Sequence, residues 1–424
     1  MKALLLIGLA ACHGGGDKPR SNRGSGVAPI EVVNQPQFPD AGGRASGASG
    51  DEIEPNDGDD VATPFPLDST MRGKLDTETD VDHFRIDVDK PGALSLMVNA
   101  VDADLVVELE DGNGALVARS DRGGARVKEG IPNFGVVPGR YTAVVKAAVK
   151  RKVRPAKGKA PAPADKPGVV YELTCALVAI APNAEHEPDE DRGTANDLIV
   201  GDVGSGYIGW SGDVDVWKLS VETLSAKNSV DIEVTAIEGV ALELVVEDGI
   251  GNPVLSRKAP RGSPLIVRGF VPKVPASSPP FHYLTIKGAG SNPETAYTVK
   301  VTQQIPQTDA EIEPNDSVDK PFAMPADRTV VHARWSPGDV DCFGLAASGT
   351  ITADVNPGSD FDPIVELFVD GRSLAIANKT KKGGEEKVQG LVAAGSKATV
   401  CVKSADPNAT GEAAYDVTIQ DDAP

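Results

Sequence analysis

The chain has 424 residues, a formal net charge of −20 and only four cysteines. This length exceeds one ordinary hydrophobic core and suits about three domains. The acidity argues against nucleic acid as a general partner and favours solubility and cation binding. The low aromatic content, 4%, together with 45 Gly and 33 Pro, is typical of short strands joined by many turns.

The amino terminus carries an export pattern. Met1-Lys2 precedes the apolar run 3–9, which is too short to span a membrane permanently, so 1–11 is predicted to be a signal peptide. Its Leu-Ala-Ala-Cys ending resembles the bacterial lipobox, which implies that Cys12 becomes the lipidated first residue. The alternative is an ordinary signal peptide with a chance cysteine. Residues 12–50 then comprise the lipidated cysteine and a flexible tether rich in Gly, Pro and Ser.

A short acidic motif occurs three times. Glu-Pro-Asn-Asp at 54–57 returns at 313–316, and Glu-Pro-Asp-Glu stands at 187–190. In each case an Asp-Val-Asp follows 26 residues after the glutamate, and an aromatic residue comes two places after its second aspartate. A fixed offset held three times predicts three copies of one folding unit. The copies are placed at 51–180, 184–304 and 310–422.

Each copy begins with a predicted half-buried strand. In 80–88, period-two alternation places Phe84, Ile86 and Val88 on one face, with Asp80 and Asp82 on the same side where the strand begins. Further strands lead into Asp-Gly turns, and every copy closes on a strand that starts with Tyr. No segment has a convincing helical period. The predicted fold class is therefore all-β, with three tandem jelly-roll-like antiparallel β-sandwich domains.

Two long segments interrupt the repeat. Lys146–Gly168 holds eight Lys or Arg residues, and Pro253–Pro280 is rich in Pro. We interpret both as solvated loops that do not pair as strands. Alternatively, the basic loop meets an anionic surface such as lipopolysaccharide, or the acidic neighbouring domains.

The order of these motifs resembles the bacterial pre-peptidase C-terminal domain, a relative of collagenase collagen-binding domains. The resemblance covers nearly all of 51–422 as three copies and implies a jelly-roll β-sandwich found beside secreted proteases or in cell-surface proteins. The second copy departs from the pattern, with Asp189-Glu190 in place of Asn-Asp and Val240-Ala241-Leu242 where acids are expected. Collagen binding is not carried over, because it depends on surface aromatic residues and this chain has only three Trp.

The resemblance also implies calcium as a cofactor. In the collagen-binding relatives, an acidic segment folds against the start of the Asp-x-Asp strand and holds the ion. The residue types agree with this, because calcium takes six to eight oxygen ligands and tolerates irregular geometry. The alternative is that these acids cap turns and face water. The candidate ligands are Glu52, Glu54, Asn56, Asp57, Asp80 and Asp82; Glu185, Glu187, Asp189, Glu190, Asp213 and Asp215; and Glu311, Glu313, Asn315, Asp316, Asp339 and Asp341.

Three cysteines lie on predicted strands. Cys342 and Cys401 both have the outward parity of their strands, so an oxidising compartment permits a cross-strand disulfide if these strands are neighbours. Two separate thiols are the alternative. Cys175 has the inward parity and is predicted to be a buried, inert thiol.

No motif in the sequence indicates catalysis. The five histidines are scattered without metal-ligand spacing, and neither a Gly-x-Ser-x-Gly nor a phosphate loop is present. We therefore predict a non-enzymatic, lipid-anchored envelope protein at the outer membrane, on its periplasmic or surface face. Its calcium-stabilised sandwiches would bind an envelope protein, a secreted protease or an extracellular polymer, and not nucleic acid. The alternatives are a stiff spacer without a ligand and a divergent hydrolase.

Overall fold

The computed structural model describes residues 49–100, 102–148, 168–224, 228–274, 279–325, 330–345 and 348–422. The predicted signal peptide, Cys12, nearly all of the tether and most of the basic loop lie outside these residues. The described residues form strands and no helix, which confirms the all-β fold class. This part of the chain accordingly contains no helix that could cross a membrane.

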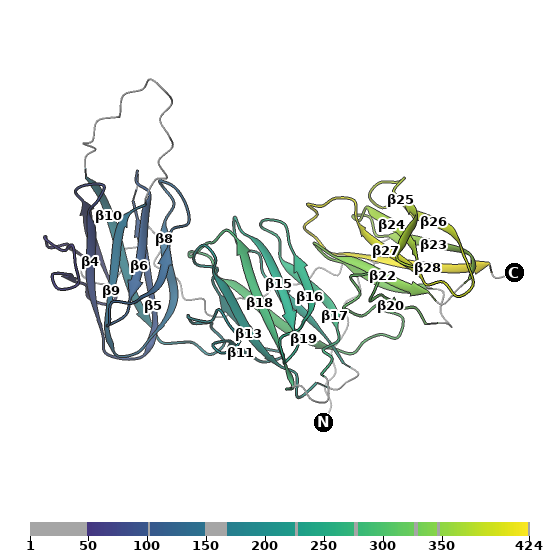
Figure 1. The fold of residues 1–424 in the computed structure, drawn as a ribbon, viewed down its shortest axis with the longest axis horizontal. Helices are drawn as coiled ribbons and strands as arrows, with labels where there is room; N and C mark the ends of the chain where they lie inside the picture. Colours follow the sequence, from purple (N-terminus) through teal and green to yellow (C-terminus); the bar gives the residue numbers. More distant parts are fainter. Residues whose placement is uncertain are drawn as a thin grey trace, which may run out of the picture. The chain divides into compact units, whose positions relative to one another are not determined.

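The first sandwich consists of two five-stranded sheets, with strand orders β1-β3-β10-β5-β8 and β2-β4-β9-β6-β7 (Figure 1). Its strands are β1 (Ser49–Asp51), β2 (Thr63–Pro64), β3 (Ser69–Leu75), β4 (Val81–Val88), β5 (Gly92–Asn99), β6 (Leu105–Glu110), β7 (Leu116–Ser120), β8 (Glu129–Val136), β9 (Gly139–Ala147) and β10 (Val169–Val178).

The second sandwich has the sheets β12-β19-β14-β17 and β11-β13-β18-β15-β16. Its strands are β11 (Asn196–Leu198), β12 (Val203–Gly206), β13 (Val214–Ser220), β14 (Ser229–Val234), β15 (Ala241–Glu247), β16 (Pro253–Lys258), β17 (Leu265–Phe270), β18 (Phe281–Ala289) and β19 (Tyr297–Gln304).

The third sandwich repeats the arrangement with the sheets β21-β28-β23-β26 and β20-β22-β27-β24-β25. Its strands are β20 (Phe322–Ala323), β21 (Val330–Trp335), β22 (Val340–Leu345), β23 (Gly349–Pro357), β24 (Pro363–Val369), β25 (Arg372–Ala377), β26 (Glu386–Val392), β27 (Ala398–Ser404) and β28 (Ala413–Asp422).

The three sandwiches correspond strand by strand, and each pair of sheets encloses one hydrophobic cluster. The aromatic residue of the Asp-x-Asp strand belongs to that cluster in every copy, because Phe84, Trp217 and Phe343 are all completely buried. Alternation along these strands places apolar side chains inside, as the sequence predicts. The first sandwich differs only at its edge, where β1 adds a short parallel strand beside β3.

One loop prediction is wrong. Pro253–Pro280 contains two strands, β16 and β17, which pair with β15 and β14. Proline does not prevent this, because Pro253 begins β16 and β16 is an edge strand, where a missing backbone donor is tolerated. Leu255 and Arg257 alternate inward along β16 and are both buried.

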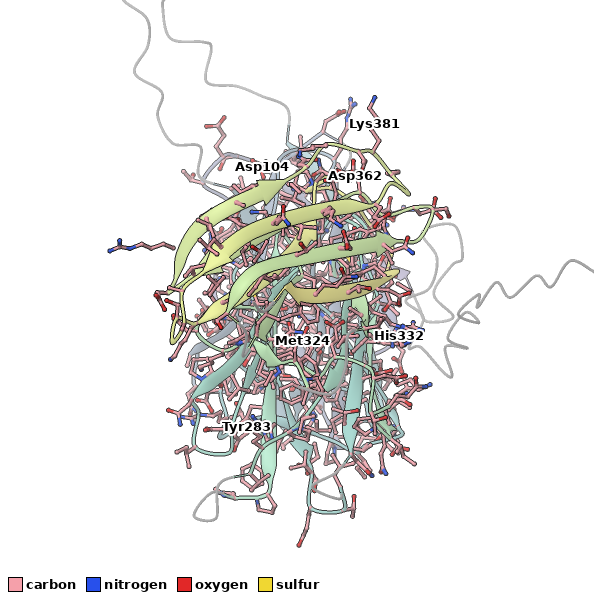
Figure 2. The ribbon with its side chains drawn as sticks, turned by 90° about the vertical axis from the view of Figure 1, so that its right-hand side faces the viewer. Asp104, Tyr283, Met324, His332, Asp362 and Lys381 are labelled. Carbon is pink, nitrogen blue, oxygen red and sulfur yellow. A yellow bond between two sulfur atoms is a disulfide. The ribbon has the colours of Figure 1, made fainter. Side chains whose placement is uncertain are left out.

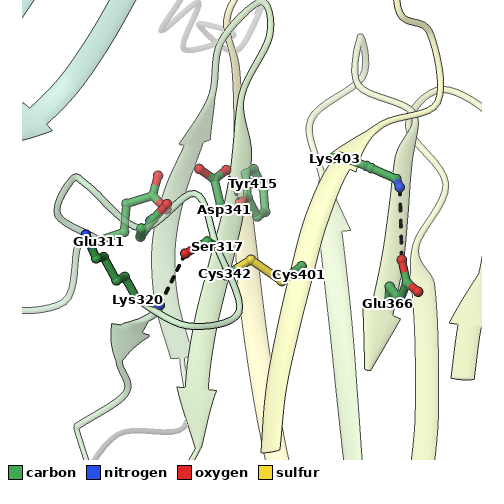
Figure 3. Close-up of a disulfide and its surroundings, with 10 residues drawn as sticks. Glu311, Ser317, Lys320, Asp341, Cys342, Glu366, Cys401, Lys403 and Tyr415 are labelled. Atoms are coloured by element: carbon green, nitrogen blue, oxygen red, sulfur yellow. Dashed lines mark hydrogen bonds and ion pairs between the residues drawn. A yellow bond between two sulfur atoms is a disulfide. The ribbon is translucent and has the colours of Figure 1, made fainter. Parts of the chain in front are cut away.

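Cys342 and Cys401 face each other across β22 and β27 and form a disulfide (Figure 3). Both lie outside the hydrophobic cluster of the third sandwich, in agreement with their outward parity, but both are nevertheless buried. Cys175 is a free thiol in the core of the first sandwich, and burial raises its pKa to about 12. It therefore stays protonated and inert.

The disulfide joins residues 59 positions apart, so its removal should destabilise the third sandwich. Cross-links of this loop length restrict the unfolded chain and contribute about 2–4 kcal/mol. We expect Cys342→Ala/Cys401→Ala to lower the free energy of unfolding of this sandwich by that amount in urea titrations. Cys175→Ala, which removes the free thiol of another sandwich, is the control. Equal stability with and without the cross-link would contradict the expectation.

Candidate metal centres

In every copy, the acidic segment folds back onto the start of its own Asp-x-Asp strand. The acidic segments are residues 52–57, 185–190 and 311–316. A backbone amide at the start of β4, β13 or β22 donates to a carbonyl of the segment, and the Glu-Pro peptide bond of the segment is cis in all three copies. The hydrogen bonds run from His83 to Asn56 (3.0 Å), from Val216 to Asp189 (3.2 Å) and from Cys342 to Asn315 (3.1 Å).

The first glutamate of each segment is oriented by a neighbouring strand. Its carboxylate accepts a hydrogen bond from a main-chain amide: Lys74 to Glu52 (2.7 Å), Tyr207 to Glu185 (3.0 Å) and Arg334 to Glu311 (2.6 Å). The second glutamate accepts from the amide two residues further along, at distances between 2.7 and 3.0 Å. These contacts hold both carboxylates at the mouth of the strand.

A tyrosine at or near the start of each closing strand, β10, β19 or β28, is a member of the site that the sequence pattern did not assign. Tyr171 donates to Asp82 at 2.5 Å, and Tyr415 donates to Asp341 (Figure 3). In the second copy Tyr297 donates instead to Glu185 at 3.2 Å. The recurrence of Tyr at one place in all three repeats was the available signal.

The second copy has the most deeply buried cluster. One oxygen each of Glu187, Asp189 and Asp213, and both oxygens of Asp215, have no hydrogen-bond partner. None of the ion pairs among the described residues involves these groups. The relative exposures are Glu185 1%, Glu187 1%, Asp189 0%, Asp213 2% and Asp215 0%. Five carboxylates are thus buried together without a positive side chain, whereas Glu190 is exposed.

This burial raises the pKa of every carboxyl group in the cluster. Loss of hydration is the main cause, and repulsion between neighbouring carboxylates adds to it. The pKa rises to about 7 for Asp213, about 8 for Asp189 and about 12 for Glu187. The pKa values of Glu185 and Asp215 are also raised well above the ordinary range. At neutral pH the cluster must therefore hold protons or a cation.

The first copy is more open. Asn56 and Asp82 are buried, but Glu52 and Asp80 are only partly so, and Glu54 is exposed. Oxygens of Glu52, Glu54 and Asp82 lie within 4.8 Å of one another. Burial raises the pKa of Asp82 to about 8.

Two further details distinguish the first copy. Asp80 turns towards Asp76, whose amide donates to it at 2.5 Å, and Asp57 is exposed and lies in none of the carboxylate groups. The Asn56 amide has one end 3.2 Å from both Glu54 and Asp82. If that end is the NH₂ group it donates to both carboxylates, and if it is the oxygen the three groups suit a cation between them.

In the third copy an arginine side chain enters the carboxylate cluster. Arg257 of β16 places its guanidinium 2.8 Å from Glu313 and 3.0 Å from Asp316, and it also hydrogen-bonds Asp339. The Arg257 side chain is completely buried. Asp341 lies deeper, against Tyr415. Sequence reasoning missed this arginine because it belongs to the preceding repeat.

Histidines are peripheral to the three clusters. His332 lies on the surface of the third sandwich (Figure 2), where its Nδ1 is 2.6 Å from Asp416. His83 forms a similar pair with Asp59 at 3.0 Å. The ligand atoms available in the clusters are therefore oxygens.

The oxygen geometry of the second cluster fits calcium. Oxygens of Glu187, Asp213 and Asp215 lie within 4.8 Å of one another, and calcium bonds oxygen at 2.3–2.6 Å. The cluster offers five oxygens without partners, close to the six to eight that calcium takes. Magnesium is less suitable because it retains several waters, for which a buried cluster of carboxylates leaves little room.

Comparisons with known proteins give only faint likenesses. No family model matches the sequence, and no curated protein matches it. The pre-peptidase C-terminal domain of a collagenase from Bacillus anthracis is similar over 27% of this chain and 93% of its own, with 18% identity and a TM-score of 0.20. A putative secreted protein from Eubacterium rectale covers 57% of this chain and 73% of its own, at 11% identity and a TM-score of 0.19.

A protein with a triple jelly-roll fold, from the turret of an archaeal virus, covers 85% of both chains at 8% identity and a TM-score of 0.18. Likenesses at this level say nothing about function. The membership of the pre-peptidase C-terminal family stays a prediction.

The raised pKa values predict how stability depends on pH. The folded chain holds protons that the unfolded chain, with carboxyl pKa values near 4, releases. In metal-free buffer the free energy of unfolding should therefore fall as pH rises from about 4 to about 8. One pKa unit corresponds to about 1.4 kcal/mol, so a decrease of a few kcal/mol is expected in urea titrations at pH 5 and pH 8.

Asp189→Asn is the matched control for this effect, because it introduces the residue that the other two repeats carry at this position. It removes one titrating group and should flatten the pH profile. A wild-type stability that is constant or rises between pH 5 and pH 8 would refute the electrostatic account.

Proposed function

We propose that the chain is a non-catalytic scaffold of the cell envelope whose β-sandwiches are stabilised and connected by calcium. The observation that carries the proposal is the second cluster, where five buried carboxylates have no positive partner. Buried charges of one sign are costly unless they are paired or coordinate a metal. Calcium removes this penalty and uses oxygens that the protein leaves without partners.

The position of the acidic segments supports a connecting role. The second segment pairs with β8 of the first sandwich: Glu187 donates its amide to Asn133 at 3.0 Å and accepts from Gly135 at 2.8 Å. The third segment repeats these contacts on β17, where Glu313 pairs with Gly269 and Val271 at 3.1 and 3.0 Å. An ion that fixes such a segment therefore also fixes the junction between two sandwiches.

Anchoring through Cys12 is part of the same proposal. A lipidated cysteine followed by a tether would hold the sandwiches at the outer membrane, on its periplasmic or surface face. Several acyl chains on one residue would anchor the protein firmly, which a single chain does not.

Calcium should raise the melting temperature. At 10 mM calcium, a site with a dissociation constant of about 10⁻⁴–10⁻³ M contributes about 1.4–2.7 kcal/mol. This corresponds to an increase of about 3–8 °C by differential scanning calorimetry. Asp215→Asn should abolish most of the increase, because both oxygens of Asp215 lack partners. Asp82→Ala tests the first cluster in the same way.

Asp57→Asn provides the control, since Asp57 is exposed and lies outside the carboxylate groups. It should retain the full increase. A melting temperature that does not respond to calcium would exclude the proposal.

Binding of a partner by the sandwich surfaces is a second role. A scaffold that acts only as a stiff spacer does not require it. The two roles are separated by a pull-down from envelope extract with soluble 51–424 in the presence of calcium. Saturable capture of an envelope protein, a secreted protease or an extracellular polymer supports a binding module. Capture no greater than that of a variant with a scrambled surface supports the spacer.

A further inference from the structure

The second and third clusters both bury several carboxylates, but only the third contains a positively charged side chain. The first and second sandwiches each have an edge strand that follows their Asp-Gly turn, β7 and β16. Each of these strands carries a buried residue nine positions after the Asp of the turn. In the first sandwich this residue is Ser120 on β7, and in the second it is Arg257 on β16; the exposures are 0% and 1%. Ser120 donates to Glu129 at 2.6 Å within its own sandwich. Arg257 instead reaches into the next repeat.

The Arg257 guanidinium lies where a metal ion would need to be. The oxygens of Glu313, Asp339 and Asp341 that lie within 4.8 Å of one another are the third-copy counterparts of Glu187, Asp213 and Asp215. Arg257 already donates to two of these three carboxylates. A divalent cation among them would be repelled by the guanidinium and would compete for the same oxygens.

The surrounding residues agree with this difference in charge. The second cluster has Asp189 where the third has Asn315, so it carries one more carboxyl group and lacks the arginine. The approach of the two sandwiches at Arg257 is also close: a Cβ on Gly338 would lie 1.9 Å from the Lys258 carbonyl oxygen. Gly338 has a φ of +83°, so this close turn requires glycine on both grounds.

We propose that Arg257 is a built-in cation that replaces calcium in the third cluster, so that the junction between the second and third sandwiches is closed without metal. At the junction between the first and second sandwiches, calcium is then the cation of the cluster, beside the main-chain pairing of Glu187 with Asn133 and Gly135. This inference rests on the proposed function for the second cluster. The second acidic segment then forms a calcium-responsive junction, and the third acidic segment forms a calcium-independent one.

The test is Arg257→Ser, which introduces the residue found at the corresponding position of the first sandwich. The probe is calcium alone, and the readout is the number of ions bound per full chain in equilibrium dialysis at pH 7.5. Arg257→Ser should bind one more calcium than the wild type. Adding Asp341→Asn should remove that extra ion. Lys258→Ser changes the exposed neighbour on the same strand, which pairs with Glu243 at 3.3 Å, and should leave the number unchanged.

Hydrogen exchange on the wild type gives a measurement that does not depend on the folding of a variant. Calcium should slow exchange of the Glu187 and Asp189 amides and leave the Glu313 and Asn315 amides unchanged. Calcium-dependent slowing at Glu313 and Asn315, or a folded Arg257→Ser that gains no ion while the wild type binds calcium, would overturn the inference. The wild type could also bind no calcium while Arg257→Ser binds one ion. This result would support the role of Arg257 as the cation of the third cluster and would refute the proposed function.

Discussion

The main-chain hydrogen bond between the acidic segment and the start of its own Asp-x-Asp strand determines the rest of the site. It brings a Glu-Pro motif and an Asp-x-Asp motif, 26 residues apart in sequence, to one end of a sandwich. The second aspartate then occupies an inward position on a strand whose next inward residue is a core aromatic. Strand parity therefore forces a carboxylate into the edge of the core, and each copy must neutralise it.

All three copies place a tyrosine hydroxyl against the buried carboxylates, but they differ in what else surrounds these groups. One hydrogen bond does not compensate several carboxylates. In the first copy Glu54 is exposed, so fewer carboxylates have to be neutralised inside the protein. In the third, Arg257 supplies a positive charge. The second has neither, and burial and mutual repulsion raise the pKa of all five of its buried carboxyl groups. The copy that departs most from the motif is thus the one with the strongest demand for a cation.

The sequence was sufficient for the features that depend on local pattern. Alternation around Phe84 predicts the strand and its inward face, and the repeated offset predicts the three copies, because both follow from the pattern within one repeat. The return of the acidic segment onto the strand was implied by the family resemblance. Burial of the clusters could not be predicted in this way. It depends on contacts from the preceding sandwich, and Arg257 reaches Glu313 across 56 residues. In the sequence, Asp189 is only a departure from the Asn of the other two copies, whereas its surroundings make it part of the cluster with the most buried carboxyl groups.

The neighbouring sandwich explains why the clusters differ in burial. The second segment pairs with β8 and the third with β17, but among the described residues no sandwich precedes the first segment, and only the short strand β1 accompanies it. Accordingly, Glu54 is exposed, whereas its counterparts Glu187 and Glu313 are 1% and 4% exposed. Joining two sandwiches therefore removes water from the carboxylates at the junction. The cost of that desolvation is lowered when the carboxyl groups take up protons or a cation, so charge neutralisation and the connection between sandwiches are coupled.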